Sequence, residues 1–229
     1  MSEQVPWKPR GLLNVDPAIF VANPERRCPC ILLLDTSSSM AGEPIRELAG
    51  GVRQLIDELK QDELAAKRIE LAAVTFGPVR ADADFADVWG FVMPKFEAYG
   101  DTPMGAAITA ALAIVEQRKA IYKANAIPYY KPWIFLITDG APTDEWQVAA
   151  QRVRDGEGAG RFQFFPVGVA GADMAVLARM SLRPPAKLRG LAFREFFKWV
   201  SGTLKSVSAS RPGDRLALPP PSGWTEVTT

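Results

Sequence analysis

The chain has 229 residues, of which 48% are hydrophobic and 23% are charged, so it can bury the core of one α/β domain with a small extension. Its 27 Lys and Arg residues nearly balance its 26 Asp and Glu residues, and the resulting net charge of +1 gives no electrostatic ground for binding nucleic acid or an anionic membrane. Histidine is absent, which excludes Ser-His-Asp and Cys-His catalysis, His-ligated zinc and a histidine general base.

Residues 1–27 are predicted to form a polar lead-in segment. Residues 1–16 contain charges and two prolines but no apolar core region, so we expect no signal peptide. No segment reaches the roughly 18 apolar residues of a membrane span, so we expect a cytoplasmic protein without a membrane partner. Arg26 and Arg27 are interpreted as a solvated entrance to the first strand. Cys28 and Cys30, the only cysteines, are interpreted as small buried thiols that are too close for an ordinary disulfide.

Apolar runs and turn signals divide the following residues into alternating strands and helices. Runs rich in β-branched and aromatic residues predict buried strands at 29–35, 69–76, 133–138 and 162–169, and a run interrupted by acids predicts an edge strand or hairpin at 79–91. Apolar residues at helical spacing predict helices at 44–59, 103–122, 143–153, 173–180 and 191–207. Thr143 is expected to cap the third of these helices, and Gly156, Gly158 and Gly160 are expected to form the loop after it.

This alternation of strands and helices predicts a doubly wound α/β fold with a mainly parallel central sheet flanked by helices. We expect one domain over residues 28–207. A proline-rich tail at 208–229 should be extended, and either disordered or strapped along the domain.

A cluster of oxygen-bearing side chains is expected where the strands end. The run Asp35-Thr36-Ser37-Ser38-Ser39 follows the first strand, Thr102 precedes the second helix, and Asp139 follows the strand at 133–138. In an open α/β sheet, ligands bind beyond the carboxyl ends of the strands. Carboxylate and hydroxyl oxygens suit magnesium, calcium or manganese. Helix N-termini behind Ser39 and Thr102 are expected to favour an incoming anion.

The same residues resemble the metal-ion-dependent adhesion site of the von Willebrand factor type A family. That pattern is D-x-S-x-S, then a distant Thr, then a distant Asp, and the resemblance covers about residues 28–205. It implies a metal-ligand set of Asp35, Ser37, Ser39, Thr102 and Asp139, with the two aspartates acting directly or through water. Ser38 stands where the family usually has Gly.

This resemblance implies a metal-dependent protein-interaction module, not an enzyme, and therefore no catalytic residue. An Asp or Glu of a protein partner would complete the shell of a Mg²⁺ ion, with Ca²⁺ and Mn²⁺ as alternatives.

Several stretches resemble, more narrowly, the TerY-type domains of the bacterial tellurium-resistance group. They are LLLD at 32–35 with GEPI at 42–45, FLITDGAPTD at 135–144, FREFFKW at 193–199, and Trp224 in the tail. This resemblance implies an adaptor or scaffold in a bacterial stress-response or phage-defence system. A kinase, a phosphatase or an ATPase of the same system would be its partner.

Three other functions compete with this interpretation. A metal-dependent phosphohydrolase would use Asp35 as its nucleophile, but Ser37 stands where such enzymes usually carry a second Asp, and no lysine is identifiable for the phosphate. A role as cofactor of an ATPase machine stays within the interaction class, and co-purification of a ring ATPase would distinguish it. An extracellular adhesion domain is opposed by the absence of a secretion signal and of a disulfide framework.

Overall fold

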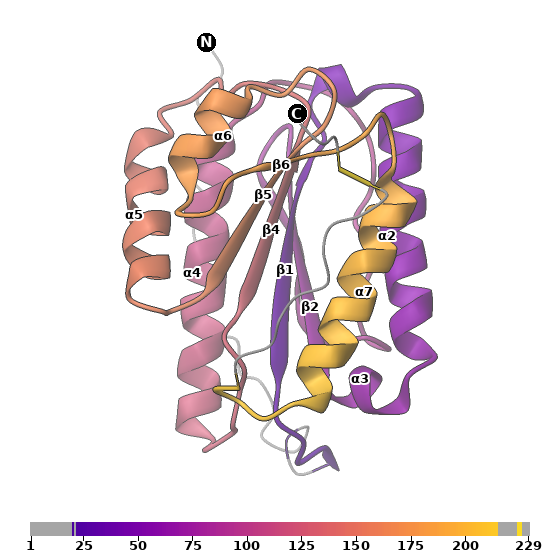
Figure 1. Cartoon of the computed structure of the whole chain (residues 1–229), viewed down its shortest axis with the longest axis vertical. Helices are drawn as coiled ribbons and strands as arrows, with labels where there is room; N and C mark the ends of the chain where they lie inside the picture. Colours follow the sequence, from indigo (N-terminus) through magenta and orange to yellow (C-terminus); the bar gives the residue numbers. More distant parts are fainter. Residues whose placement is uncertain (1–19, 21, 215–223, 226–229) are drawn as a thin grey trace.

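The computed structural model describes residues 20, 22–214 and 224–225, and its centre is a six-stranded sheet in the order β3-β2-β1-β4-β5-β6 (Figure 1). The strands are β1 (Cys28–Asp35), β2 (Ile69–Phe76), β3 (Arg80–Asp87), β4 (Trp133–Thr138), β5 (Gln163–Gly168) and β6 (Ala186–Lys187). Neighbouring strands are parallel except for β2 and β3, which are antiparallel. The predicted doubly wound, mainly parallel α/β fold is therefore confirmed.

Helices cover both faces of this sheet. They are α2 (Glu43–Lys60), α3 (Glu63–Arg68), α4 (Met104–Ala124), α5 (Gln147–Gly158), α6 (Met174–Met180) and α7 (Phe193–Ala209), with a short 3-10 helix, η1 (Ser38–Met40), after β1. Helices α2, α3 and α7 pack on one face, and α4, α5 and α6 pack on the other (Figure 1). Leu32 and Leu34 of β1 point to the first face, and Ile31 and Leu33 point to the second. Because both faces are covered, β1 can be apolar at consecutive positions.

The prediction of a helix at 143–153 with a glycine loop after it is wrong in two respects. Helix α5 begins at Gln147, after Trp146, so Thr143 does not cap it. Gly156 and Gly158 lie within the helix. A Cβ at Gly156 would come within 2.3 Å of the Phe162 ring, so this glycine lets the helix pack closely on the start of β5.

Arg27 is buried, contrary to the prediction of a solvated strand entrance. Its Nε lies 3.1 Å from one carboxylate oxygen of Glu70 on β2, and Arg118 of α4 lies 2.7 Å from the other oxygen. The hydroxyl of Tyr122 also donates to Glu70. This cluster joins the segment before β1 to both β2 and α4, at the end of the sheet where β1 and β2 begin.

Along most of its length, the outer edge of β5 cannot form backbone hydrogen bonds with an additional strand. β6 pairs only with Val167 and Gly168. Below them, the N–H of Phe164 donates to the Glu157 carboxylate at 3.1 Å, and its carbonyl accepts from the Ser181 hydroxyl at 3.4 Å. Pro166 has no N–H to offer.

The described part of the tail is packed against α7. Trp224 is buried, with its ring centroid 4.9 Å from that of Phe196 and 5.4 Å from that of Trp199, and its carbonyl accepts from the N–H of Arg189 at 2.7 Å. Most of the predicted lead-in and most of the tail lie outside the described residues, so the domain boundaries at 27 and 207 stay predictions. Within the described residues, no helix has the length and hydropathy needed to cross a membrane.

Candidate metal centre

Four of the five predicted ligands lie at or just after the carboxyl ends of β1 and β4, and these strands end in the upper part of the molecule in Figure 1. Asp35 is the last residue of β1, and Asp139 directly follows β4. These two strands are neighbours in the sheet, so the residues after them are close in space although about a hundred positions separate them in the sequence. Thr102 enters from the loop that leads into α4.

Hydrogen bonds connect four of these residues. Ser37 Oγ lies 3.0 Å from Ser39 Oγ, and Ser39 Oγ donates to Asp139 Oδ1 at 2.7 Å. Asp35 Oδ1 accepts the N–H of Ser37 at 2.8 Å, and Asp35 Oδ2 accepts the Thr138 hydroxyl at 2.5 Å. The sequence did not single out Thr138, whose role is to hold the buried carboxylate in place.

Thr102 completes the group from the side of α4. The residue is only 6% exposed, and its Oγ1 has no hydrogen-bond partner among the described residues. This oxygen lies 3.5 Å from the position that a Cβ would take at Gly140, immediately beside Asp139. The lone pairs of this hydroxyl are therefore available to a ligand.

The N-terminus of α4 is already occupied by a carboxylate of the same chain. The two carboxylate oxygens of Asp144 accept the N–H groups of Gly105 at 2.9 Å and Ala106 at 2.8 Å. The prediction that the helix N-terminus behind Thr102 would favour an incoming anion is therefore wrong, because Asp144 fills that role.

Three backbone segments meet beneath the cluster with no room for a side chain between them. A Cβ at Gly77 would lie 2.5 Å from the carbonyl oxygens of Thr36 and Tyr99. A Cβ at Gly100, where φ is +77°, would lie 2.6 Å from the carbonyl oxygen of Gly77. The N–H of Tyr99 donates to Thr36, and that of Ser38 donates to Gly100. The loop carrying Thr102 is thereby fixed against the end of β1.

Burial raises the pKa of Asp35 to about 6, although hydrogen bonds from Ser37 and Thr138 act in the opposite direction. Burial also raises the pKa of Asp139. Both carboxylates are thus in surroundings that disfavour their negative charge, and a divalent cation would offset this cost.

The donor set fits a hard divalent cation. It consists of two carboxylates and three hydroxyls, all oxygen ligands of the kind that magnesium, calcium and manganese prefer. No group of three or more Asp, Glu, Cys or His side chains suited to a metal occurs in the described part of the chain. The candidate site therefore differs from a carboxylate-rich cage, because only two of its five oxygen donors are charged.

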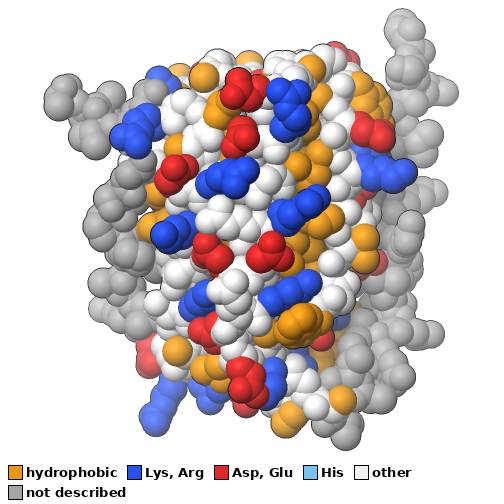
Figure 2. Space-filling view, turned by 90° about the vertical axis from the view of Figure 1, so that its right-hand side faces the viewer, with side chains coloured by type: hydrophobic (Ala, Val, Ile, Leu, Met, Phe, Trp, Pro, Cys, Tyr) orange, Lys and Arg blue, Asp and Glu red, His pale blue; other side chains and the backbone are white. Residues whose placement is uncertain are grey.

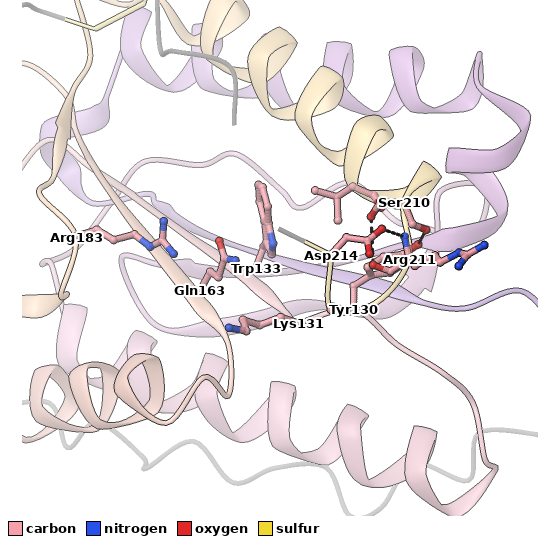
Figure 3. A pocket seen from close by; sticks show the side chains of 10 residues that line it. Tyr130, Lys131, Trp133, Gln163, Arg183, Ser210, Arg211 and Asp214 are labelled. Carbon is pink, nitrogen blue, oxygen red and sulfur yellow. Dashed lines mark hydrogen bonds between the residues drawn. The ribbon is translucent and has the colours of Figure 1, made fainter. Parts of the chain in front are cut away.

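A separate hollow of about 480 Å³ lies at the other end of the sheet (Figure 3). Arg183 lies at one side of it and Asp214 at the other, with Trp133 and Lys131 between them. Arg183 is already paired with Glu157 at 3.3 Å. The residues that line this hollow carry charges of both signs, and their oxygen atoms do not converge on one point. The hollow is therefore not a second candidate for the metal site.

Comparisons with known proteins agree with this fold. A search of curated protein sequences found no significant match. Among solved structures, the proximal thread matrix protein 1 of the mussel byssus shares 16% identity over 79% of this chain and 48% of its own, with a TM-score of 0.57. The vWF domain of the pilus tip protein Mfa5 from Porphyromonas gingivalis shares 10% identity over 83% of this chain and 99% of its own, with a TM-score of 0.60.

The manganese-loaded TRAP protein of Plasmodium vivax shares 16% identity over 75% of this chain and 73% of its own, with a TM-score of 0.50. This chain spans about half the length of the byssus protein. At such identities these likenesses concern the fold alone. A family model described as the von Willebrand factor type A domain matches residues 30–196. The chain belongs to the von Willebrand factor type A family.

Proposed function

We propose that this chain is a metal-dependent protein-interaction module. Its metal ligands are Asp35, Ser37, Ser39, Thr102 and Asp139, and an Asp or Glu of a partner protein completes the shell. The observation that carries this proposal is the hydrogen-bonded chain from Ser37 through Ser39 to Asp139, beside the buried Asp35 and the unpartnered Thr102 hydroxyl. Domains of this family generally mediate metal-dependent adhesion between proteins.

The charges of the ligand set bear on how a partner carboxylate would bind. The two aspartates balance the charge of a divalent ion, and the three hydroxyls add none. With one or both aspartates acting through water, the bound ion would supply an electron-poor centre for one further carboxylate oxygen. We propose magnesium on ligand type, with calcium and manganese as alternatives.

A titration of the metal tests this proposal. Magnesium binding would be measured by calorimetry on the wild type, on Ser37→Ala/Ser39→Ala, and on Ser206→Ala as a matched control from the exposed side of α7. We expect saturable binding to the wild type and the control, and none to the double variant. A pull-down with magnesium or with a chelator would then retain the same prey only with metal and intact serines. Equal capture by all three proteins in chelator would contradict the proposal.

The surroundings of Asp35 do not favour the phosphohydrolase alternative. Asp35 has no exposed surface, and its two carboxylate oxygens accept hydrogen bonds from Ser37 and Thr138. A nucleophile must reach its substrate, so these contacts support a ligand role and no catalytic one. Turnover of a generic phosphate ester that is abolished by Asp35→Asn would reverse this assignment.

We further propose that the module serves as a cytoplasmic adaptor in a bacterial stress-response or phage-defence system, with a kinase, a phosphatase or an ATPase as partner. This finer assignment rests on the TerY-type stretches at 32–35, 42–45, 135–144 and 193–199. Affinity purification from a native bacterial lysate, followed by mass spectrometry, tests it. Magnesium-dependent recovery of only cell-surface or pilus proteins would contradict it.

A further inference from the structure

The segments that carry the five ligands contain acidic residues and no basic ones. Residues 35–43, 99–105 and 139–145 hold Asp35, Glu43, Asp101, Asp139, Asp144 and Glu145, and not one Lys or Arg. The chain as a whole has almost equal numbers of the two signs. The excess of negative charge is therefore local to the candidate site.

Three of these six carboxylates have a role within the site or the fold, and three do not. Two belong to the proposed ligand set, and Asp144 caps α4. Glu43, Asp101 and Glu145 are exposed, and their side chains have no ion pair or hydrogen bond within the described part of the chain. We call these three residues the acidic rim.

Basic residues begin only outside these segments. Arg46 lies one turn into α2, and the charge of Arg80, at the start of β3, is matched by Asp82 at 3.5 Å. On the side of the molecule where α2 runs, Figure 2 shows Lys and Arg beside Asp and Glu, without a single-sign field. The three segments that carry the ligands thus differ in charge from the helical side.

A ligand at this end is indicated by an observation independent of the acids. Thr102 is more than nine-tenths buried as a residue, and its hydroxyl has no partner among the described residues and lies against the loop of Asp139. The acidic rim therefore surrounds a place where something is expected to bind, and it sets the electrostatic conditions for whatever approaches.

We propose that the partner presents its metal-binding carboxylate from a basic surface, as an Asp or Glu flanked by Lys or Arg. This inference rests on the proposed function and names the chemistry of the partner. The six carboxylates outnumber the two positive charges of one divalent ion, so an acidic partner surface is repelled even when the ion is present. Flanking Lys or Arg side chains would pair with Glu43, Asp101 and Glu145. The ion itself would bind any partner carboxylate, and the acidic rim would favour those that are flanked by basic residues.

The first arm of the test measures the electrostatic potential around the candidate site in the absence of a partner. Amide relaxation by a cationic nitroxide, 3-aminomethyl-PROXYL, is compared with relaxation by the anionic 3-carboxy-PROXYL in the magnesium-loaded protein. We expect the cationic probe to be favoured about threefold at Gly42, Gly100 and Gly140. The opposite preference is expected at Gly202, which lies between Lys198 and Lys205 on α7. Equal relaxation by the two probes at the first three amides overturns the inference.

The second arm measures selectivity with three capped peptides of equal length. Each carries one central Asp, flanked by two Lys, two Gln or two Glu. We expect magnesium-dependent binding to be tightest for the Lys-flanked peptide, weaker for the Gln-flanked peptide and weakest for the Glu-flanked peptide. At low ionic strength the affinities should span about tenfold, and this difference should shrink when salt is added. Glu43→Gln/Asp101→Asn/Glu145→Gln should remove this order but retain magnesium binding. The matched control Asp57→Asn/Glu63→Gln/Asp84→Asn removes three exposed acids elsewhere and should retain the order.

The outcomes separate this inference from the function on which it rests. Magnesium-dependent binding that is equal for the three peptides, or an order that survives in the rim variant, overturns the inference and leaves the proposed function in place. If no peptide binds more tightly with magnesium than with chelator, the proposed function fails, and the inference fails with it.

Discussion

Thr102 and Thr143 hold one another by two hydrogen bonds. The N–H of Thr102 donates to Thr143 Oγ1 at 3.0 Å, and the N–H of Thr143 donates to the Thr102 carbonyl at 3.0 Å. These bonds tie the loop before α4 to the loop after β4, which carry the proposed ligands Thr102 and Asp139. Neither ligand can move far without the other, so the geometry of the site depends on a residue that has no contact with the metal in the proposed ligand set.

Thr143→Val should therefore weaken magnesium binding, by about tenfold, because it removes the acceptor Oγ1 and keeps the branched shape of the side chain. Calorimetric titration would measure the affinity. Thr109→Val is the matched control, since Thr109 is exposed on α4 and its hydroxyl bonds only to the carbonyl of Gly105. An affinity equal to that of the control would mean that the Thr102–Thr143 pair does not position the ligand.

Gly77→Ala should lower the free energy of unfolding by about 2 kcal/mol, because the new methyl group would meet two backbone oxygens at 2.5 Å. Urea unfolding would measure this change. At Gly202 on α7, an added Cβ would have no neighbouring atom within 4 Å outside the helix's own backbone. Gly202→Ala should therefore stabilise α7 by up to about 1 kcal/mol. A neutral Gly77→Ala would show that the loops beneath the site can separate at little cost.

Glu70→Gln should destabilise the protein by about 3 kcal/mol in the same assay. The substitution leaves the buried Arg27 and Arg118 without their shared carboxylate. Glu63→Gln, at a fully exposed pair with Lys67, should have no measurable effect. Similar unfolding midpoints for the two variants would argue that water reaches the cluster around Glu70.

The features that the sequence predicted best are the strands formed by long apolar runs. The predicted strands at 69–76 and 133–138 coincide with β2 and β4, because their side chains are buried on both faces and are mostly apolar, with Glu70, Thr75 and Thr138 as the polar exceptions. The five oxygen ligands could be placed together for a related reason, since the order of strands and helices fixes which strand ends are adjacent.

The sequence predicted least well the residues whose partners are far along the chain. Thr143 and Asp144 precede α5 and look like its caps, yet their side chains bond to the start of α4. Capping chemistry shows that a residue suits a helix start but cannot identify which helix in the fold it will meet. Arg27 was placed in solvent for the same reason, because its partner Glu70 is 43 positions away.

Cys28 and Cys30 should resist alkylation in the folded protein. Burial raises the pKa of Cys28 to about 12, and it raises that of Cys30 as well, so neither thiol forms the reactive thiolate at neutral pH. We expect mass spectrometry to find no iodoacetamide adduct at pH 8 in buffer and two adducts in urea. Rapid labelling of either cysteine without denaturant would reveal frequent opening of β1.

The closed edge of β5 restricts how another chain can join this molecule. A strand from a partner, or from a second copy in a growing fibril, would have to displace Glu157 and Ser181 from Phe164 and would then face Pro166, which has no donor. Recognition by strand addition is blocked at this border of the sheet. A protein that binds at this border must contact side chains and loops, because it cannot extend the sheet there.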